Sequence, residues 1–303
     1  PNIITLLSED EKNSLTQALW KYVSNYTEEP SDSLGRACLH LYKLVPQDEK
    51  QYVISTLKKY NIPELSSELI SDLLKEDTNT LPFPILYELY NGLPYSNENK
   101  TNVYEALLEH IKTAPSIDSI ISSIASSKYL SNFAYLAGFV TKWNVVGPFP
   151  WQYGDGINSD LWITEFLDKR EEIVYKGEKY PWKVMETEGW GYINLLKLCE
   201  GGTTECSNLC AYGVAKISVP EAIEGFILLG SDDGFGLWIN RQHFCAKNAD
   251  RGMRVDEDKI PVKLRQGTNE IILLITQIKG GWNFCLRIVD TNNAPINFSI
   301  EDN

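Results

Sequence analysis

The chain has 303 residues and a mass of 34.4 kDa, about twice the usual size of a domain, so two domains are expected. Its 43% apolar and 23% charged residues are typical of globular proteins and exclude disordered and collagen-like classes. The net charge of −13 would repel nucleic acid and anionic membrane surfaces. No apolar run approaches the roughly 20 residues that a membrane-spanning helix needs. We therefore expect neither a nucleic-acid partner nor a membrane span.

The first half of the chain has helical spacing of its apolar residues. In residues 8–26, Ser8 and Glu11 have capping-box spacing, and Leu15, Leu19 and Val23 share one helical face. Further helices are predicted at 34–44, 46–60, 63–75, 84–90, 102–112, 115–127 and 129–137. Short amphipathic helices with short links suit antiparallel pairs. Residues 1–140 are therefore predicted to form an α-helical, repeat-like bundle, similar to HEAT or tetratricopeptide arrays in architecture alone.

The second half, from Trp143 onward, changes to a period of two. Strands are predicted at 210–219, 225–240, 260–264, 269–279 and 282–290, separated by turn dipeptides such as Asp233-Gly234. Strands that follow one another without helices predict an antiparallel sandwich or jelly roll over residues 141–303. Trp20 and Cys38 are the only Trp and Cys residues before this half, which supports a boundary near residue 140. The predicted fold class is a multidomain α+β protein.

Two segments carry a family resemblance. They are WNVVGPFP at 143–150 and GSDDGFGLWIN at 230–240, the latter followed by strand-like sequence up to residue 290. Together they resemble β-sandwich domains of the galactose-binding-like and protective-antigen or adhesin class, over about half of the chain. In bacteria such domains are often joined to helical or enzyme modules in extracytoplasmic proteins. The resemblance implies ligand or partner binding rather than catalysis, and leaves the ligand open.

The adjacent acidic residues Asp232 and Asp233 are the main candidate ligand site. In sugar-binding adhesin-like members two neighbouring aspartates in a loop hold Ca²⁺, which in turn holds sugar hydroxyls, and this pair matches them by type. Calcium takes six to eight oxygen ligands, so further donors are needed. The best acidic loop elsewhere contains Asp155, Asn158 and Asp160. The alternative is an ordinary Asp-Asp-Gly turn without metal, with Gly234 at positive φ.

Exposed tryptophans are a second kind of candidate, because an aromatic ring can stack on the apolar face of a sugar. Core packing is the alternative for every one of them. Trp238 alternates with apolar neighbours in a strand and is expected in the core. Trp151 follows a proline and Trp190 lies between two glycines, so these two are the better surface candidates.

The cysteines predict a disulfide in the second half. Cys199, Cys206 and Cys210 cluster around a Gly-Gly pair, where a short loop-closing disulfide would indicate an oxidising compartment. A zinc site is the alternative, but the spacing is not that of a zinc finger and no His lies within ten residues.

An enzyme hypothesis would start from His243, with Cys245 or the acidic pair beside it. The sequence contains no nucleophile elbow, phosphate-binding loop, metalloprotease helix or dinucleotide fingerprint. We therefore expect no catalysis and no obligatory cofactor, with calcium as the one candidate ion and His243 as a candidate binding residue.

The function predicted from sequence is that of a non-catalytic extracytoplasmic interaction protein. In this interpretation the helical half and the sandwich join larger protein components, as an accessory or assembly subunit, by partner binding or self-assembly. The alternative is a lectin-like carbohydrate-binding module, with or without calcium.

Overall fold

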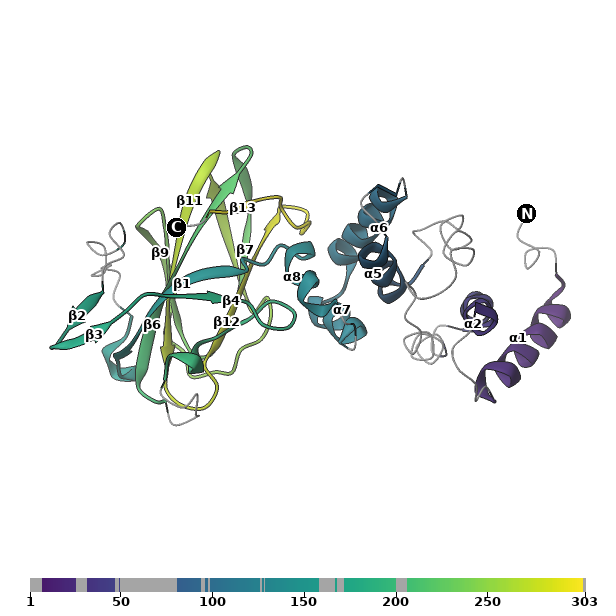
Figure 1. The fold of residues 1–303 in the computed structure, drawn as a ribbon, viewed down its shortest axis with the longest axis horizontal. Coiled ribbons are helices and arrows are strands. Elements are labelled where there is room, and N and C mark those ends of the chain that lie inside the picture. Colours follow the sequence, from purple (N-terminus) through teal and green to yellow (C-terminus); the bar gives the residue numbers. More distant parts are fainter. Residues whose placement is uncertain are drawn as a thin grey trace. The chain divides into compact units, whose positions relative to one another are not determined.

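The computed structural model describes residues 7–25, 32–46, 49, 81–93, 96–97, 99–125, 127, 129–157, 167, 172–199 and 206–301. The chain divides into two compact units, 1–110 with 122–129, and 111–121 with 130–303. Each is described by itself (Figure 1). The boundary near residue 140 stays a prediction. Among the described helices, none is long and apolar enough to cross a membrane.

The helices lie in the first part of the chain, as the apolar spacing predicts. The described ones are α1 (Glu9–Ser24), α2 (Asp32–Leu44), α5 (Phe83–Gly92), α6 (Lys100–Thr113), α7 (Ile117–Ile124) and α8 (Phe133–Leu136), the last preceded by a 3₁₀ turn (Leu130–Asn132). The capping box of α1 is confirmed: the Ser8 N–H donates to Glu11 Oε2 at 2.8 Å and the Glu11 N–H donates to Ser8 Oγ at 3.4 Å. The helices predicted at 46–60 and 63–75 lie outside the described residues.

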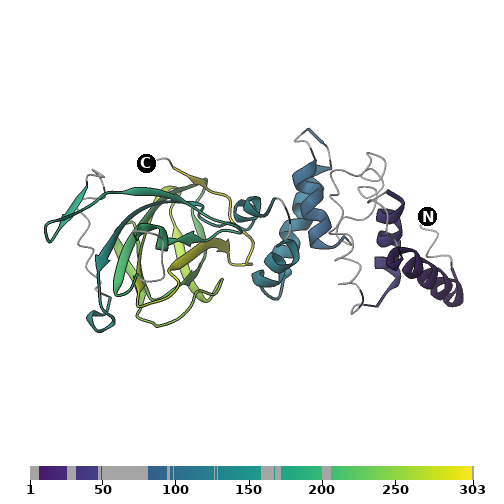
Figure 2. The same cartoon turned by 60° about the horizontal axis from the view of Figure 1, so that its bottom comes forward.

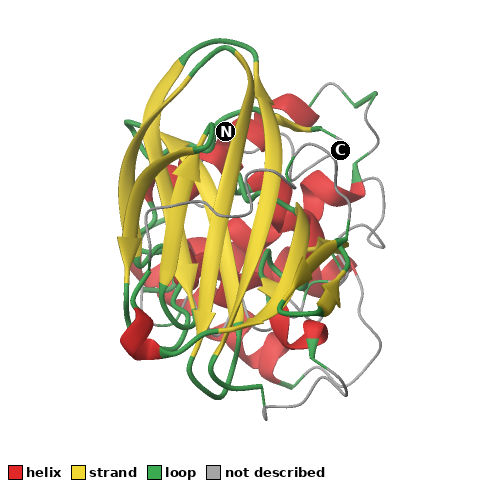
Figure 3. Cartoon of the chain, turned by 90° about the vertical axis from the view of Figure 1, so that its left-hand side faces the viewer, coloured by secondary structure: helices red, strands yellow, loops and turns green. Residues whose placement is uncertain are grey.

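The second unit is built around two antiparallel sheets (Figure 3). The larger has the order β4-β1-β6-β11-β8-β9, with β13 also pairing with β6, and the smaller has the order β10-β7-β12-β5. A separate hairpin joins β2 to β3. The strands are β1 (Lys142–Pro150), β2 (Ile173–Tyr175), β3 (Glu178–Tyr180), β4 (Lys183–Glu186), β5 (Ile193–Asn194), β6 (Leu209–Val219), β7 (Ile223–Ser231), β8 (Phe235–Ile239), β9 (Gln242–Lys247), β10 (Asp258–Leu264), β11 (Gly267–Gln277), β12 (Asn283–Asp290) and β13 (Ser299–Ile300).

The larger sheet is buried on both faces. Its inner face packs against the smaller sheet, around Trp143, Leu273 and Phe284, and Figure 2 shows the strands curving around this shared interior. Its outer face carries a second apolar cluster that includes Phe149 and Trp238 and is joined by residues of the β2–β3 hairpin. Strands buried on both faces need continuous apolar runs. This requirement explains why β6 and β11 lack a clean alternation of apolar and polar residues.

The strand predictions agree with the observed sheets. The segment predicted as one strand at 225–240 forms two strands, β7 and β8, on either side of the Asp-Asp-Gly turn. The turn dipeptide Asp233-Gly234 marks this break in the sequence. The sequence missed β9 because its side chains are mostly exposed and show no apolar alternation. The β8–β9 hairpin itself has a clear local cause: Asn240 and Arg241 both have positive φ, at 52° and 67°, as a two-residue turn of this kind requires.

Candidate functional site

The Asp-Asp-Gly segment is a rigid turn between β7 and β8. Main-chain bonds hold it to both sheets: the Asp232 N–H donates to Asn283 O at 2.9 Å, and the Asp233 N–H donates to Thr276 O at 2.8 Å. The Ser231 hydroxyl donates to Asp233 O at 2.8 Å. The peptide bond that joins the two aspartates is cis. The hydrogen bonds to Thr276 and Asn283 fix the position of the turn relative to the end of β11 and the start of β12.

The Asp233 carboxylate is buried and is held by two main-chain donors. The Ile278 N–H donates to Oδ2 at 2.6 Å, and the Arg251 N–H donates to Oδ1 at 2.9 Å. Burial raises the pKa of Asp233, while these hydrogen bonds oppose that rise. Each oxygen accepts one N–H, so Asp233 closes the turn, and each keeps a further lone pair, although only 2% of the residue is exposed.

The Asp232 carboxylate is different, because no donor within the described residues forms a hydrogen bond with it. It is partly buried and lies against Gly281, where an added Cβ would come within 2.7 Å of Oδ2. Burial raises the pKa of Asp232 to about 7, and the charges of Asp233 and Asp250 add to the rise. Within the described residues no cation pairs with this half-buried carboxyl group, so its ionised form is disfavoured.

Gly234 is needed for space rather than for its backbone angle. The expectation of positive φ at this residue is wrong, because Gly234 is not among the residues with positive φ. Instead, an added Cβ would lie 2.6 Å from Lys247 O and 3.0 Å from the Thr276 hydroxyl. The close approach of the end of β9 to the turn is what excludes a side chain here.

Arg251 supports the turn from the side. Its Nε donates to Asp233 O at 3.3 Å, its Nη2 donates to Ser231 Oγ at 2.7 Å, and it forms an ion pair with Asp258. Burial alone would raise the pKa of Asp258, but hydrogen bonds from Arg251 and Lys247 lower it overall. Arg251 is thus paired with Asp258 and, at 3.4 Å, with Glu257, and no contact between it and the Asp232 carboxylate is found among the described residues.

The residues of the turn fit part of a calcium coordination sphere. Asp232 offers an unpartnered carboxylate, Asp233 offers remaining lone pairs, and the charge of Asp250 acts on both. Within the described residues no three or more His, Cys, Asp or Glu side chains lie close enough to hold a metal together. Since calcium takes six to eight oxygens, main-chain carbonyls, water or ligand hydroxyls would complete the sphere.

The acidic loop predicted to supply further ligands for Asp232 and Asp233 makes no contact with them among the described residues. Asp155 is exposed, and its Oδ2 accepts a hydrogen bond from the Gln152 N–H at 3.0 Å, so it caps its own short turn. Asn158 and Asp160 lie outside the described residues. The neighbours of the acidic pair include Asp250, Arg251, Ile278 and Gly281, and no sequence pattern links any of these four to the turn.

The two tryptophan candidates have different surroundings. The prediction of Trp151 as a surface platform is wrong: it is 7% exposed, and its Nε1 donates to Gly156 O at 2.9 Å. The Trp151 ring packs in the apolar cluster on the outer face of the larger sheet. Trp190 is partly exposed and lies between Phe139 and Tyr192, with ring centroids 5.7 and 5.5 Å away. Trp238 is buried, as predicted.

His243 and Cys245 lie on β9 and do not form a nucleophile–base pair. The exposed His243 ring packs edge-on against Trp238 at 5.5 Å, and no His243–Cys245 hydrogen bond is found in the described structure. Burial, followed by the charge of Asp258, raises the pKa of the Cys245 thiol. An activated cysteine nucleophile needs the opposite shift. The described ring contact of His243 is with Trp238, and no contact with the acidic pair is found among the described residues.

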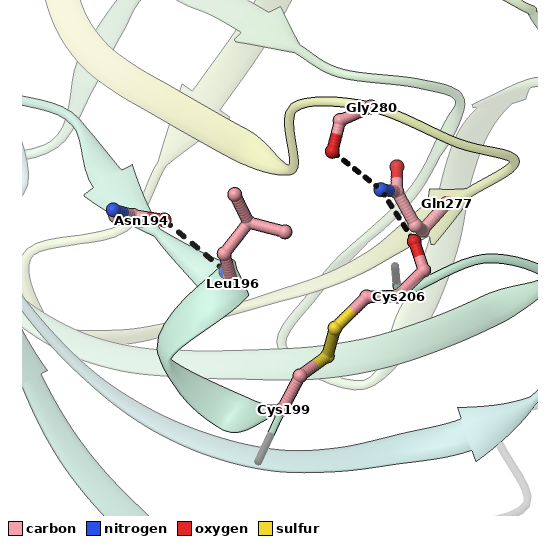
Figure 4. Close-up of a disulfide and its surroundings, with 6 residues drawn as sticks. All are labelled: Asn194, Leu196, Cys199, Cys206, Gln277 and Gly280. Atoms are coloured by element: carbon pink, nitrogen blue, oxygen red, sulfur yellow. Dashed lines mark hydrogen bonds between the residues drawn. A yellow bond between two sulfur atoms is a disulfide. The ribbon is translucent and has the colours of Figure 1, made fainter. Parts of the chain in front are cut away.

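The predicted disulfide is found between Cys199 and Cys206, whose Cα atoms lie 6.3 Å apart (Figure 4). The pairing favours the disulfide over the zinc alternative for these two residues. Cys210, the third candidate, is a buried free thiol, and burial raises its pKa to about 12. Beside the disulfide, Gln277 Nε2 donates to Cys206 O at 3.1 Å and to Gly280 O at 3.2 Å. These contacts connect the disulfide to the β11–β12 loop that lies against Asp232.

Comparisons with known proteins find only distant structural similarity. No family model and no curated protein matches the chain. The PA14 sugar-binding domain from an RTX adhesin is 12% identical, over 54% of this chain and 96% of that one, with a TM-score of 0.31. The PA14 domain of an antifreeze protein is 13% identical, over 55% and 87%, with a TM-score of 0.28.

The β-glucosidase of Kluyveromyces marxianus gives a TM-score of 0.32 at 10% identity, over 39% of this chain. The match spans only 15% of that enzyme. TM-scores of this size support no inference about activity. What the structure itself shows is a helical region followed by an antiparallel sandwich.

Proposed function

We propose that this chain is a non-catalytic glycan-binding protein whose site is the Asp232–Asp233 turn, with calcium as the bridging ion. The observation that carries the proposal is the half-buried Asp232 carboxylate, which has no hydrogen-bond donor within the described residues, beside the main-chain-anchored carboxylate of Asp233. Two neighbouring carboxylates repel each other, and a divalent cation removes that cost.

Calcium suits this pair better than a softer metal, because all the donors are hard oxygens. The ion would supply the electrostatic attraction for sugar hydroxyls. The protein's own part is to hold Asp233 through Ile278 and Arg251 and to keep the Asp232 carboxylate beside Gly281. A site anchored on strand ends loses little conformational freedom when a ligand binds.

The assembly interpretation is not carried forward, because nothing in the described part of the chain favours it. The partner proposed here is a glycan. The Cys199–Cys206 disulfide supports an oxidising, extracytoplasmic location. The raised thiol pKa of Cys245 supports the absence of thiol catalysis.

The direct test is glycan retention by the purified chain on an array, with calcium and with EDTA. We expect retention only with calcium, and Asp232→Asn should weaken calcium binding by roughly 100-fold because a charged ligand is lost. Gly281→Ala should also weaken it, since the new Cβ displaces the Asp232 carboxylate while keeping its charge. Gly154→Ala is the matched control, because nothing lies within 4 Å of that position. Equal retention in EDTA, or full calcium binding by Asp232→Asn, would contradict the proposal.

The raised pKa of Asp232 predicts a pH dependence with a definite sign. Below about pH 7 calcium must displace a proton from this carboxyl group, so calcium affinity should rise between pH 5 and 8, approaching tenfold per pH unit below about 7. Without calcium the raised pKa means that the folded state holds the proton more tightly than the unfolded state. The free energy of unfolding should therefore fall as pH rises from about 4 to 7.

Both effects can be measured as melting temperatures at several pH values, with and without calcium. In the native chain, the increase in melting temperature that calcium causes should become larger as the pH rises. In Asp232→Asn this increase should be the same at every pH. A calcium-induced increase that is the same at pH 5 and pH 8 would show that Asp232 does not bind the ion.

A further inference from the structure

A second candidate site lies at the other end of β7. It is an open groove of about 500 Å³, and its walls include Glu224, Phe226, Phe244, Pro261, Lys263 and Thr291. Glu224 is near the start of β7, whereas Asp232 follows its end, so on the order of 25 Å of strand separates the two places. The groove is therefore independent of the acidic turn.

The groove is formed where β9 and β10, from opposite sheets, come together. An ion pair of 2.7 Å between Lys247 and Asp258 joins the end of β9 to the start of β10. The pairing register of β9 with β8 shifts between His243 and Cys245, which makes Phe244 the extra residue of a bulge. A bulge redirects a side chain. Phe244 accordingly projects outward, with 45% of its surface exposed.

The floor of the groove is apolar, and one aromatic face is already covered. Phe226 and Pro261 are directly paired across β7 and β10 and share the outer face of the smaller sheet. Lys259 Nζ lies 4.0 Å from the Phe226 ring centroid and donates to Asn293 Oδ1 at 2.8 Å. The cation occupies one face of Phe226, which leaves Phe244 as the exposed ring available to a ligand.

The rim carries a donor and an acceptor side by side. Lys263 Nζ lies 2.6 Å from Glu224 Oε1, and these side chains are 81% and 67% exposed. Such an exposed pair contributes little to folding. An ammonium group next to a carboxylate matches two neighbouring hydroxyls of a sugar, one accepting a hydrogen bond and the other donating one. Since the two charges cancel, the rim favours a neutral ligand over an anion or a cation.

From this combination of an exposed ring, an apolar floor and a neutral polar rim, we infer that the groove binds one neutral pyranose unit without a metal ion. The apolar C–H face of the sugar stacks on Phe244, and its hydroxyls bond to Glu224 and Lys263. The inference extends the proposed glycan-binding function, because two separated contacts on one glycan would raise its overall affinity. Its chemistry does not depend on calcium or on Asp232.

The test is saturation-transfer NMR of the full chain in EDTA with methyl β-glucopyranoside, methyl α-mannopyranoside and methyl β-galactopyranoside. At least one glycoside should receive saturation, and Phe244→Ala should weaken its binding about fivefold or more. Replacement of both rim charges, Glu224→Gln with Lys263→Met, should also weaken it. Tyr135→Ala removes a ring that is 73% exposed elsewhere and should have no effect. Because Phe244 is exposed, its replacement leaves the fold intact, which circular dichroism checks.

The outcomes separate this inference from the calcium proposal. Binding in EDTA that is lost in Phe244→Ala and kept in Asp232→Asn supports the groove, even if calcium adds nothing. Binding that requires calcium and is lost in Asp232→Asn alone overturns the groove and leaves the acidic site standing. No binding of any of the three glycosides in EDTA, or equal binding by Phe244→Ala, also overturns the groove.

Discussion

Trp143→Ala is expected to destabilise the second unit by about 3–5 kcal/mol. The Trp143 side chain is fully buried, its ring meets the edge of Phe284 at 5.1 Å, and its Nε1 donates to Val140 O at 2.9 Å. A Cβ added at Gly213 would lie 3.3 Å from Cε3 of Trp143, so the strand that carries Gly213 already packs closely against this ring. The substitution therefore removes apolar contacts and leaves a cavity.

Urea unfolding followed by circular dichroism measures this effect, with the transition of the second unit evaluated by itself. Trp190→Ala is the control. Because Trp190 is partly exposed, this substitution should lower the free energy of unfolding much less. A loss below about 1 kcal/mol for Trp143→Ala would mean that the space collapses and that Trp143 is not a central part of this core.

Arg287→Met is expected to destabilise the same unit by about 3 kcal/mol, because it leaves the Asp256 carboxylate without its partner. The Arg287 side chain is 6% exposed, and its Nε donates to Asp256 Oδ1 at 2.8 Å. Its Nη2 forms an ion pair with the same carboxylate, and its Nη1 donates to Ala137 O at 3.4 Å. Because Asp256 keeps 22% exposure, the loss should fall at the lower end of the range for buried ion pairs.

The double variant Arg287→Met with Asp256→Asn should recover most of that stability, since neither charge is then buried alone and asparagine tolerates the φ of 58° at residue 256. Lys263→Met breaks an exposed ion pair of similar length and should leave the urea midpoint unchanged. If the double variant is as unstable as Arg287→Met alone, the loss comes from packing rather than from an unpaired charge. The double variant thus distinguishes a loss of packing from an unpaired buried charge.

Local patterns predicted the elements of the fold well. Runs rich in strand-forming residues and bounded by turn dipeptides identified β6, β10, β11 and β12, and the capping-box spacing of Ser8 and Glu11 identified the start of α1. These features depend on residues that are neighbours in the chain, so their physical cause is present in any short segment. The short strands β2 to β5 and the exposed β9 lack such a signal, since their pairing depends on the sheets around them.

The first of the two segments that carry the family resemblance, residues 143–150, has a mainly structural role. Trp143 fills the core between the sheets, and Gly147 has a φ of 140° and would bring an added Cβ within 3.0 Å of Ala211. These residues are required for two strands to approach closely. Only the Asp232–Asp233 turn of the second segment has side-chain groups left over for a ligand.

The sequence by itself determined the helical first half, the strands and turns of the second half, the acidic pair and the Cys199–Cys206 pairing as one of the options. Only the tertiary structure decided that Trp151 is buried, that Arg251 is balanced by Asp258, and that Gly281 lies against Asp232. Only the tertiary structure also brought Phe244 of β9 next to β10. The physical reason is that propensity and periodicity act over a few residues, whereas the surroundings of a carboxylate or a ring depend on strand register between distant segments.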